Sequence, residues 1–132
     1  MDKNTSNPEV TNISFTKFIS NPYDCPVTRT MSFIGGKWKP IILFCLSQQT
    51  MRYGKLRFYM PAISSKVLTQ ELKELEFLGL IDRQVFKELP PRVEYSLSKT
   101  GESLKPVLKV LCDWGKATGI ELENSKLNIN VL

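Results

Sequence analysis

The residues best suited to chemistry in this chain are polar side chains repeated at helical spacing. At about 100° per residue, Lys66, Gln70 and Lys73 share one side of a helix, with Thr69 on one flank and Glu74 on the other. Lysine attracts phosphates, and glutamine and threonine hydrogen-bond to base edges in the major groove. This face therefore suits contact with DNA. The alternative is an ordinary amphipathic helix whose outer face is solvated.

The opposite face and the two ends of this helix can also be read from the sequence. Ser64 or Ser65 is placed to cap the first turn by accepting a hydrogen bond from an unpaired N–H, and Gly79 supplies a left-handed stop after Leu78. The inner face carries three leucines: Leu68, Leu72 and Leu75.

A shorter helix and a strand pair flank this segment. Arg52 to Met60 predicts a helix that ends at Pro61, and Ala62-Ile63 forms the turn. Residues 80–86 and 92–97 predict two strands, because apolar and polar residues alternate in the second. A helix–turn–helix followed by a β-hairpin is a winged helix, which lays one helix in the major groove of DNA. We therefore expect an α+β, mainly helical fold.

Basic residues stand at the tip of the predicted hairpin. Pro90 and Pro91 cannot continue a ladder because proline lacks the N–H donor, so Lys87 and Arg92 lie at the tip or shoulder. They could contact phosphate or the minor groove; equally, they could be ordinary surface charges on an exposed hairpin.

Apolar stripes at both ends of the chain predict two further helices. Val27, Met31 and Ile34 recur at helical spacing near the N-terminus, and residues 104–115 carry a second stripe with Trp114 beside it. A second copy of the chain is the simplest partner for both stripes, so we expect a homodimer. The alternative is that the two end helices cover each other within a monomer. A further helix, over residues 41–46, is expected to be buried nearly all round.

Composition limits the class of protein. A chain of 132 residues fits one domain, and we expect an N-terminal arm (1–24), a winged-helix domain with dimerisation helices (25–118) and a C-terminal tail (119–132). The longest apolar run, Pro40 to Leu46, is too short to span a membrane, and the polar N-terminus predicts the cytosol.

Charge and cysteine content narrow the function. The net charge is +5, and between Cys25 and Lys73 the only acid is Glu71, which suits a phosphate-facing surface or, alternatively, a generic basic face. The chain has no histidine, and its three cysteines form no CxxC pair, so we expect no metal site, no cofactor and no enzyme.

Four blocks of residues, spread over about residues 25 to 116, form a recognisable pattern. The blocks are Cys25-Pro26-Val27 with Ile34-Gly35-Gly36-Lys37-Trp38; Arg52-Tyr53-Gly54 through Ile63-Ser64 to Gly79-Leu80; Pro90-Pro91-Arg92-Val93-Glu94-Tyr95-Ser96-Leu97 with Gly101; and Leu108 with Trp114-Gly115. In this order and spacing they resemble the motifs of the HxlR-type winged-helix transcription regulators of bacteria and archaea. Ala62 and Tyr53 depart from the family's common glycine and phenylalanine.

The resemblance implies a homodimer joined through its terminal helices, two recognition helices in adjacent major grooves of an operator, and wings on flanking DNA. Carried onto this chain, it places Lys87 and Arg92 in the wing. The groove-facing set that it implies is Ser64, Ser65, Lys66, Thr69, Gln70 and Lys73.

Cys25 is a candidate sensor of oxidants or electrophiles. In several family members a cysteine at this position has that role, and here a helix N-terminus and Arg29 favour the thiolate, whereas Asp24 opposes it. The alternative is an unreactive thiol. Cys45 is expected to be buried, and Cys112 could be either buried or reactive.

Two other functions compete with DNA-binding regulation. A winged helix can serve only for contact with other proteins, which would predict no retention of DNA even at low salt. A cysteine enzyme built on Cys25 would need an unusual base, because the chain has no histidine.

Overall fold

The computed structural model describes the backbone of residues 20–131 and the side chains of residues 20–126. The chain divides into two compact units between Ser32 and Phe33. Residues 1–19 of the expected arm lie outside the described residues, and the end of the arm forms a short 3-10 helix, η2 (Pro22–Asp24), before helix α2 (Pro26–Ile34).

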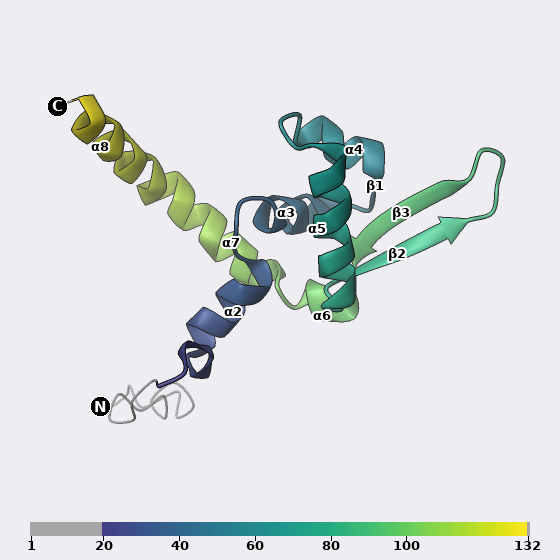
Figure 1. Ribbon diagram of the computed structural model, residues 1–132, viewed down its shortest axis with the longest axis horizontal. Coiled ribbons are helices and arrows are strands. Elements are labelled where there is room, and N and C mark those ends of the chain that lie inside the picture. The colour runs from purple at the N-terminus through teal and green to yellow at the C-terminus, as the bar shows by residue number, and fades with distance from the viewer. Residues whose placement is uncertain (1–19, 132) are drawn as a thin grey trace. The chain divides into compact units, whose positions relative to one another are not determined.

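The second unit contains the predicted winged helix (Figure 1). Its strands form an antiparallel sheet in the order β1-β3-β2, with Ile81 opposite Leu97 and Phe86 opposite Arg92. Strand β1 was not predicted, because two residues are too few to show an alternating pattern. The elements are α3 (Lys39–Gln48), β1 (Met51–Arg52), α4 (Tyr53–Tyr59), α5 (Ser65–Phe77), β2 (Ile81–Phe86) and β3 (Arg92–Leu97).

Helix α5 begins and ends where the sequence predicts. The hydroxyl of Ser64 accepts a hydrogen bond of 3.1 Å from the N–H of Val67, and Gly79 follows the helix with φ of +77°. The three predicted leucines of its inner face are buried. They pack with apolar side chains from α3, α4 and the sheet to form one core, which holds α5 against β2.

Helix α3 differs from the prediction that it is buried nearly all round. Ile42 and Leu43 are fully buried, whereas Ile41 is 37% exposed and Phe44 is 41% exposed. The prediction was wrong because an unbroken apolar run shows no period and so cannot reveal which side of a helix lacks a neighbour.

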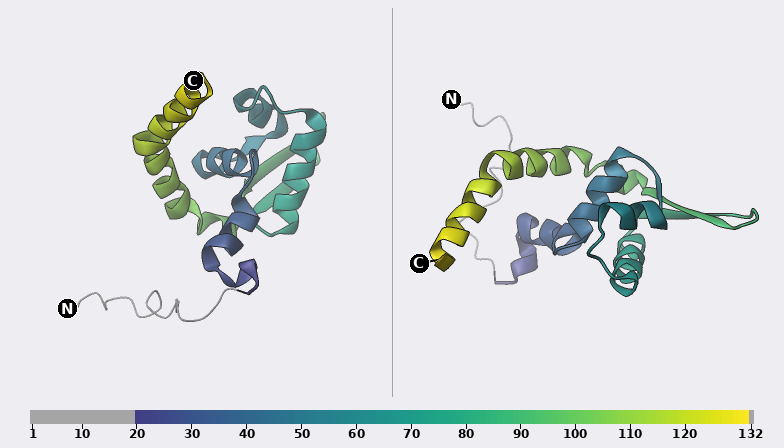
Figure 2. Two further views of the ribbon diagram at one scale, coloured as in Figure 1. Left: turned by 60° about the vertical axis from the view of Figure 1, so that its left-hand side comes forward. Right: turned by 90° about the horizontal axis from the view of Figure 1, so that it is seen from above.

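The C-terminal part of the chain is a long helical region (Figure 2). Helix α7 (Lys105–Trp114) starts with Pro106 in its first turn and continues through the π-helical turn η3 (Gly115–Gly119) into α8 (Ile120–Val131). The chain therefore stays helical past residue 118, where the sequence suggested a tail. No helix in the described part of the chain is long and apolar enough to cross a membrane.

Gly101 lies at a close backbone approach in the second unit. It belongs to the short helix α6 (Lys99–Glu102), whose cap, Ser98, accepts a hydrogen bond of 3.0 Å from the N–H of Gly101 and donates one of 2.6 Å to the carbonyl of Gly79. A Cβ at Gly101 would overlap the carbonyl oxygen of Leu80 and crowd Leu97. Only glycine fits between α6 and the end of α5.

We predict that Gly101→Ala lowers the free energy of unfolding by about 1–3 kcal/mol or more, because the new methyl group meets rigid backbone. Gly54→Ala is the control, since a Cβ there has nothing within 4 Å and alanine favours a helix. Urea unfolding of both variants measures the difference. Equal stabilities for the two variants would contradict the close approach at Gly101.

Candidate nucleic-acid interface

The outer face of α5 presents the polar residues that the sequence singled out. Lys66, Thr69, Gln70 and Lys73 are all exposed, and Ser64 and Ser65 are exposed at the start of the helix. Figure 1 shows α5 beside α4, with the β2–β3 hairpin extending away from them. The structure thus gathers the six helix residues on one element and places the two wing residues on another.

Arg57 of α4 fixes the turn that precedes α5. One guanidinium nitrogen donates a hydrogen bond of 2.8 Å to the hydroxyl of Ser65, and the other donates one of 3.1 Å to the carbonyl of Ile63. A planar guanidinium can satisfy two acceptors in a fixed fork. Arg57 belongs to the basic stretch between Cys25 and Lys73, and nothing in its spacing indicated this contact.

Tyr53 at the start of α4 holds the same end of α5. Its hydroxyl donates a hydrogen bond of 3.1 Å to the carbonyl of Ser65 and lies 3.5 Å from the hydroxyl of Thr69. The sequence analysis noted Tyr53 only as a departure from the phenylalanine common in the family. The departure adds a polar contact across the helix–turn–helix.

The serine hydroxyls at the start of α5 keep a free proton despite these contacts. Ser64 accepts a hydrogen bond from the N–H of Val67, and Ser65 accepts one from Arg57, so neither hydroxyl acts as a donor in these bonds. A hydroxyl can donate one hydrogen bond while it accepts another. Both serines can therefore still donate to a phosphate oxygen.

Lys39 does not belong to the exposed basic surface, contrary to its place in the predicted basic excess. Its ammonium lies 2.9 Å from Glu71 and 2.6 Å from Glu74, and its side chain is 14% exposed. Burial acts to lower the pKa of Lys39, but the hydrogen bonds to Glu74 and Glu71 outweigh it and raise the pKa. This lysine joins the start of α3 to α5.

Arg83 of β2 adds a basic side chain that the sequence analysis did not select. It lies opposite the buried Tyr95 in the sheet and, with Lys73 and Thr69, lines a hollow of about 260 Å³ between α5 and the sheet. The predicted strand places successive side chains on opposite faces of the sheet. The sequence does not show which of these faces lies next to α5, so it could not place Arg83 beside this helix.

The two wing residues differ in their surroundings. Lys87 is exposed in the loop after β2. Arg92 stacks at 3.9 Å over the ring of Phe86 and lies 3.4 Å from a carboxylate oxygen of Glu88 and 3.2 Å from one of Glu94. Much of the charge of Arg92 is thus balanced by neighbouring acids, whereas Lys87 presents its ammonium to solvent.

Cys25 lies immediately before α2 and is partly exposed. Hydrogen bonds from the backbone and side chain of Thr28 lower the pKa of the Cys25 thiol, and the charge of Arg29 contributes least. Of the two causes that the sequence suggested, the first turn of the helix therefore contributes more to this lowering than Arg29 does. The guanidinium of Arg29 donates hydrogen bonds of 3.1 and 2.9 Å to the carbonyl of Tyr23.

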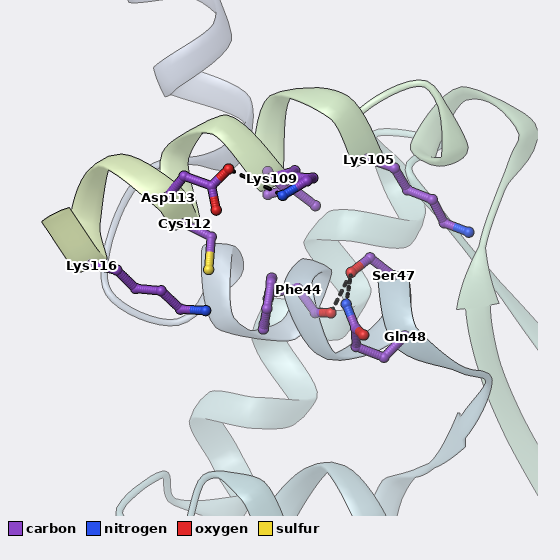
Figure 3. Close-up of a pocket in the computed structure, with 9 residues that line it drawn as sticks. Phe44, Ser47, Gln48, Lys105, Lys109, Cys112, Asp113 and Lys116 are labelled. Carbon is purple, nitrogen blue, oxygen red and sulfur yellow. Dashed lines mark hydrogen bonds and ion pairs between the residues drawn. The ribbon is translucent and has the colours of Figure 1, made fainter.

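The other two cysteines occupy different environments. Cys45 is 8% exposed, as predicted, and burial raises the pKa of its thiol. Cys112 on α7 is partly exposed and points toward Phe44 of α3 in a pocket of about 330 Å³ (Figure 3). Within the described residues, no group of three or more Cys, Asp or Glu side chains is arranged to hold a metal ion.

Comparison with known proteins identifies the family. Residues 33–122 match the HxlR-like helix-turn-helix family. The chain belongs to this family. Its members are transcriptional regulators and not enzymes, so this chain is a helix-turn-helix transcriptional regulator.

Individual relatives agree with this assignment. The chain is 45% identical over 103 residues to an uncharacterised HTH-type transcriptional regulator of Methanothermobacter thermautotrophicus, a match that covers 78% of this chain and 79% of the relative. Among solved structures it is similar to the reduced redox regulator HypR, with a TM-score of 0.72, 37% identity, and coverage of 76% and 99%. It is also similar to the reduced transcriptional regulator YodB of Bacillus subtilis, with a TM-score of 0.63, 32% identity, and coverage of 71% and 93%.

We predict that Arg57→Ala costs about 1–2 kcal/mol of unfolding free energy, because the hydroxyl of Ser65 and the carbonyl of Ile63 each lose a charged donor. Arg57→Lys is the matched control for charge; it should recover less than half of the loss, since an ammonium does not reproduce the fork. Urea denaturation gives both values. Full recovery of stability by lysine would mean that the positive charge alone, and not the pair of hydrogen bonds to Ser65 and Ile63, stabilises the turn.

Proposed function

We propose that the protein is a homodimeric, sequence-specific DNA-binding regulator whose α5 helices read the major groove of an operator. The supporting observation is that the exposed face of α5 carries Lys66, Thr69, Gln70 and Lys73 while its other face is fixed in the core. Such a face offers charges to phosphates and hydrogen-bonding groups to bases together. In this proposal Lys87 and Arg92 of the wing, with Ser64 and Ser65, contact the DNA backbone.

Exposed apolar side chains support the homodimer. On α7, Val110 is 66% exposed and Trp114 is 57% exposed, and on α2, Val27 is 69% exposed. A second copy of the chain would supply a partner for the exposed apolar side chains on each of these helices. An apolar face of this kind normally marks an interaction surface. Two copies joined there would present two recognition helices, as a two-fold operator requires.

A winged helix that only contacts proteins is the competing function. A gel-shift titration separates the two, because DNA binding through phosphates should be retained at roughly 50 mM salt and fall steeply toward 200 mM. No retention of any duplex at low salt would favour the protein-contact function.

We predict that Gln70→Ala and Lys66→Ala each cost about 1–3 kcal/mol in binding free energy at the preferred duplex and reduce base preference. The reason is that both residues lie on the exposed face of α5, where their side chains carry groups able to hydrogen-bond to base edges. Binding to the preferred duplex and to random DNA of equal length measures the effect. An equal loss on both duplexes would exclude base readout by these residues.

We further propose that oxidants or electrophiles modify Cys25 and thereby weaken or change DNA binding. Its partial exposure and the lowered pKa of its thiol favour the reactive thiolate at neutral pH. Two similar structures, those of HypR and YodB, are of regulators solved in defined redox states, and HypR is a redox regulator. Modification beside α2 would act on the dimer, and so on the spacing of the recognition helices.

We predict that iodoacetamide alkylates Cys25 before Cys45 at pH 7, because the helix N-terminus lowers the pKa of Cys25 and burial raises that of Cys45. Mass spectrometry of quenched samples gives the order. Operator binding by the wild type should then change after a mild oxidant or quinone, whereas binding by Cys25→Ser should not. Equal responses of the two proteins would remove Cys25 from the mechanism.

A further inference from the structure

Glu74 connects the core-facing and DNA-facing sides of α5. One of its carboxylate oxygens lies 2.6 Å from the ammonium of Lys39, and the other accepts a hydrogen bond of 2.9 Å from the side-chain amide of Gln70. Glu74 therefore joins a partly buried cation to one of the exposed side chains of the recognition face. The sequence placed Glu74 only on the flank of that face.

Lys39 of α3 fixes the position of the Glu74 carboxylate. Lys39 is 14% exposed and also binds Glu71, so its position is set by two acids one turn apart on α5. The hydrogen bond from Lys39, and after it that from Gln70, holds the pKa of Glu74 below its usual range. Glu74 is thus ionised at neutral pH and can only accept hydrogen bonds.

An ionised acceptor permits one orientation of the Gln70 amide. The NH₂ group must face Glu74, because a flipped amide would set its carbonyl oxygen against the carboxylate. One N–H is used in the 2.9 Å bond, which leaves the carbonyl oxygen and the second N–H of Gln70 for other partners. A glutamine without this contact would instead sample both amide orientations.

We propose that Glu74, anchored by Lys39, is a positioning residue that sets the base preference of Gln70. This inference rests on the proposed function of α5. A fixed carbonyl oxygen beside one N–H matches the major-groove edge of adenine, which offers the N6 donor beside the N7 acceptor. Guanine and thymine offer only acceptors at the corresponding positions and suit this orientation poorly.

The test is selection of bound sequences from random duplex DNA by the full-length protein. We expect the wild type to prefer adenine at one base pair in each half-site, and Gln70→Ala to lose that preference. Glu74→Ala should lose about fivefold or more of the same discrimination, because a freed amide accepts either edge. The other positions of the site should keep their preferences.

Glu71→Ala is the matched control. It removes the same charge from the same helix and the other acid bound to Lys39, but the amide of Gln70 is bonded to Glu74 and not to Glu71. Both acidic variants should therefore share any change in stability or in salt dependence, while only Glu74→Ala changes the base pair read by Gln70. Glu74→Gln, which keeps the size of the side chain, should change the same position less than alanine does.

A double variant isolates the coupling. Once Gln70 is alanine, Glu74→Ala should have no further effect on discrimination at that base pair. If the wild type selects a sequence and Gln70→Ala alters one base pair that Glu74→Ala and Glu74→Gln leave intact, the positioning role is wrong and the proposed function stands. If the wild type selects no sequence at all, the proposed function fails as well.

Discussion

Side-chain hydrogen bonds fix the first turn of α5 to α4, and the proposed recognition of DNA depends on this attachment. Arg57 bonds Ser65 and Ile63, and Tyr53 bonds the carbonyl of Ser65, so two side chains of one helix define where the next begins. The buried leucines then set which face of α5 points outward. In the proposed function, a helix fixed in this way would lose little further conformational entropy on entering a groove.

The basic residues around α5 fall into two groups: some are paired with acids, and others are exposed to solvent. The sequence suggests an undivided basic surface, but the fold turns Lys39 inward onto Glu71 and Glu74 and balances Arg92 with Glu88 and Glu94. The exposed cations that remain near α5 include Lys66, Lys73 and, in the hollow beside the sheet, Arg83. The partly buried Lys39 pairs link α3 to α5, whereas the exposed lysines stay available to phosphates.

Patterns of short range predicted most of this fold. The capping serine, the left-handed Gly79 and the alternation around Tyr95 are local signals, and each is found where the sequence placed it. Contacts between distant segments could not be predicted, because they depend on which elements meet in three dimensions. Examples are the hydrogen bonds of Arg57, the ion pairs of Lys39 and the exposure of Phe44. The exposed face of α5 followed from the spacing of its residues, whereas the partners that hold these residues could not be predicted.

The most direct test of the central claim is methylation interference on a selected duplex. Dimethyl sulfate modifies guanine N7 in the major groove and adenine N3 in the minor groove, so it reports which groove α5 occupies. We expect N7 methylation to block binding at two clusters about one helical turn apart, roughly 34–36 Å, as for a dimer with paired recognition helices. Binding that tolerates N7 methylation throughout the site would contradict major-groove recognition by α5.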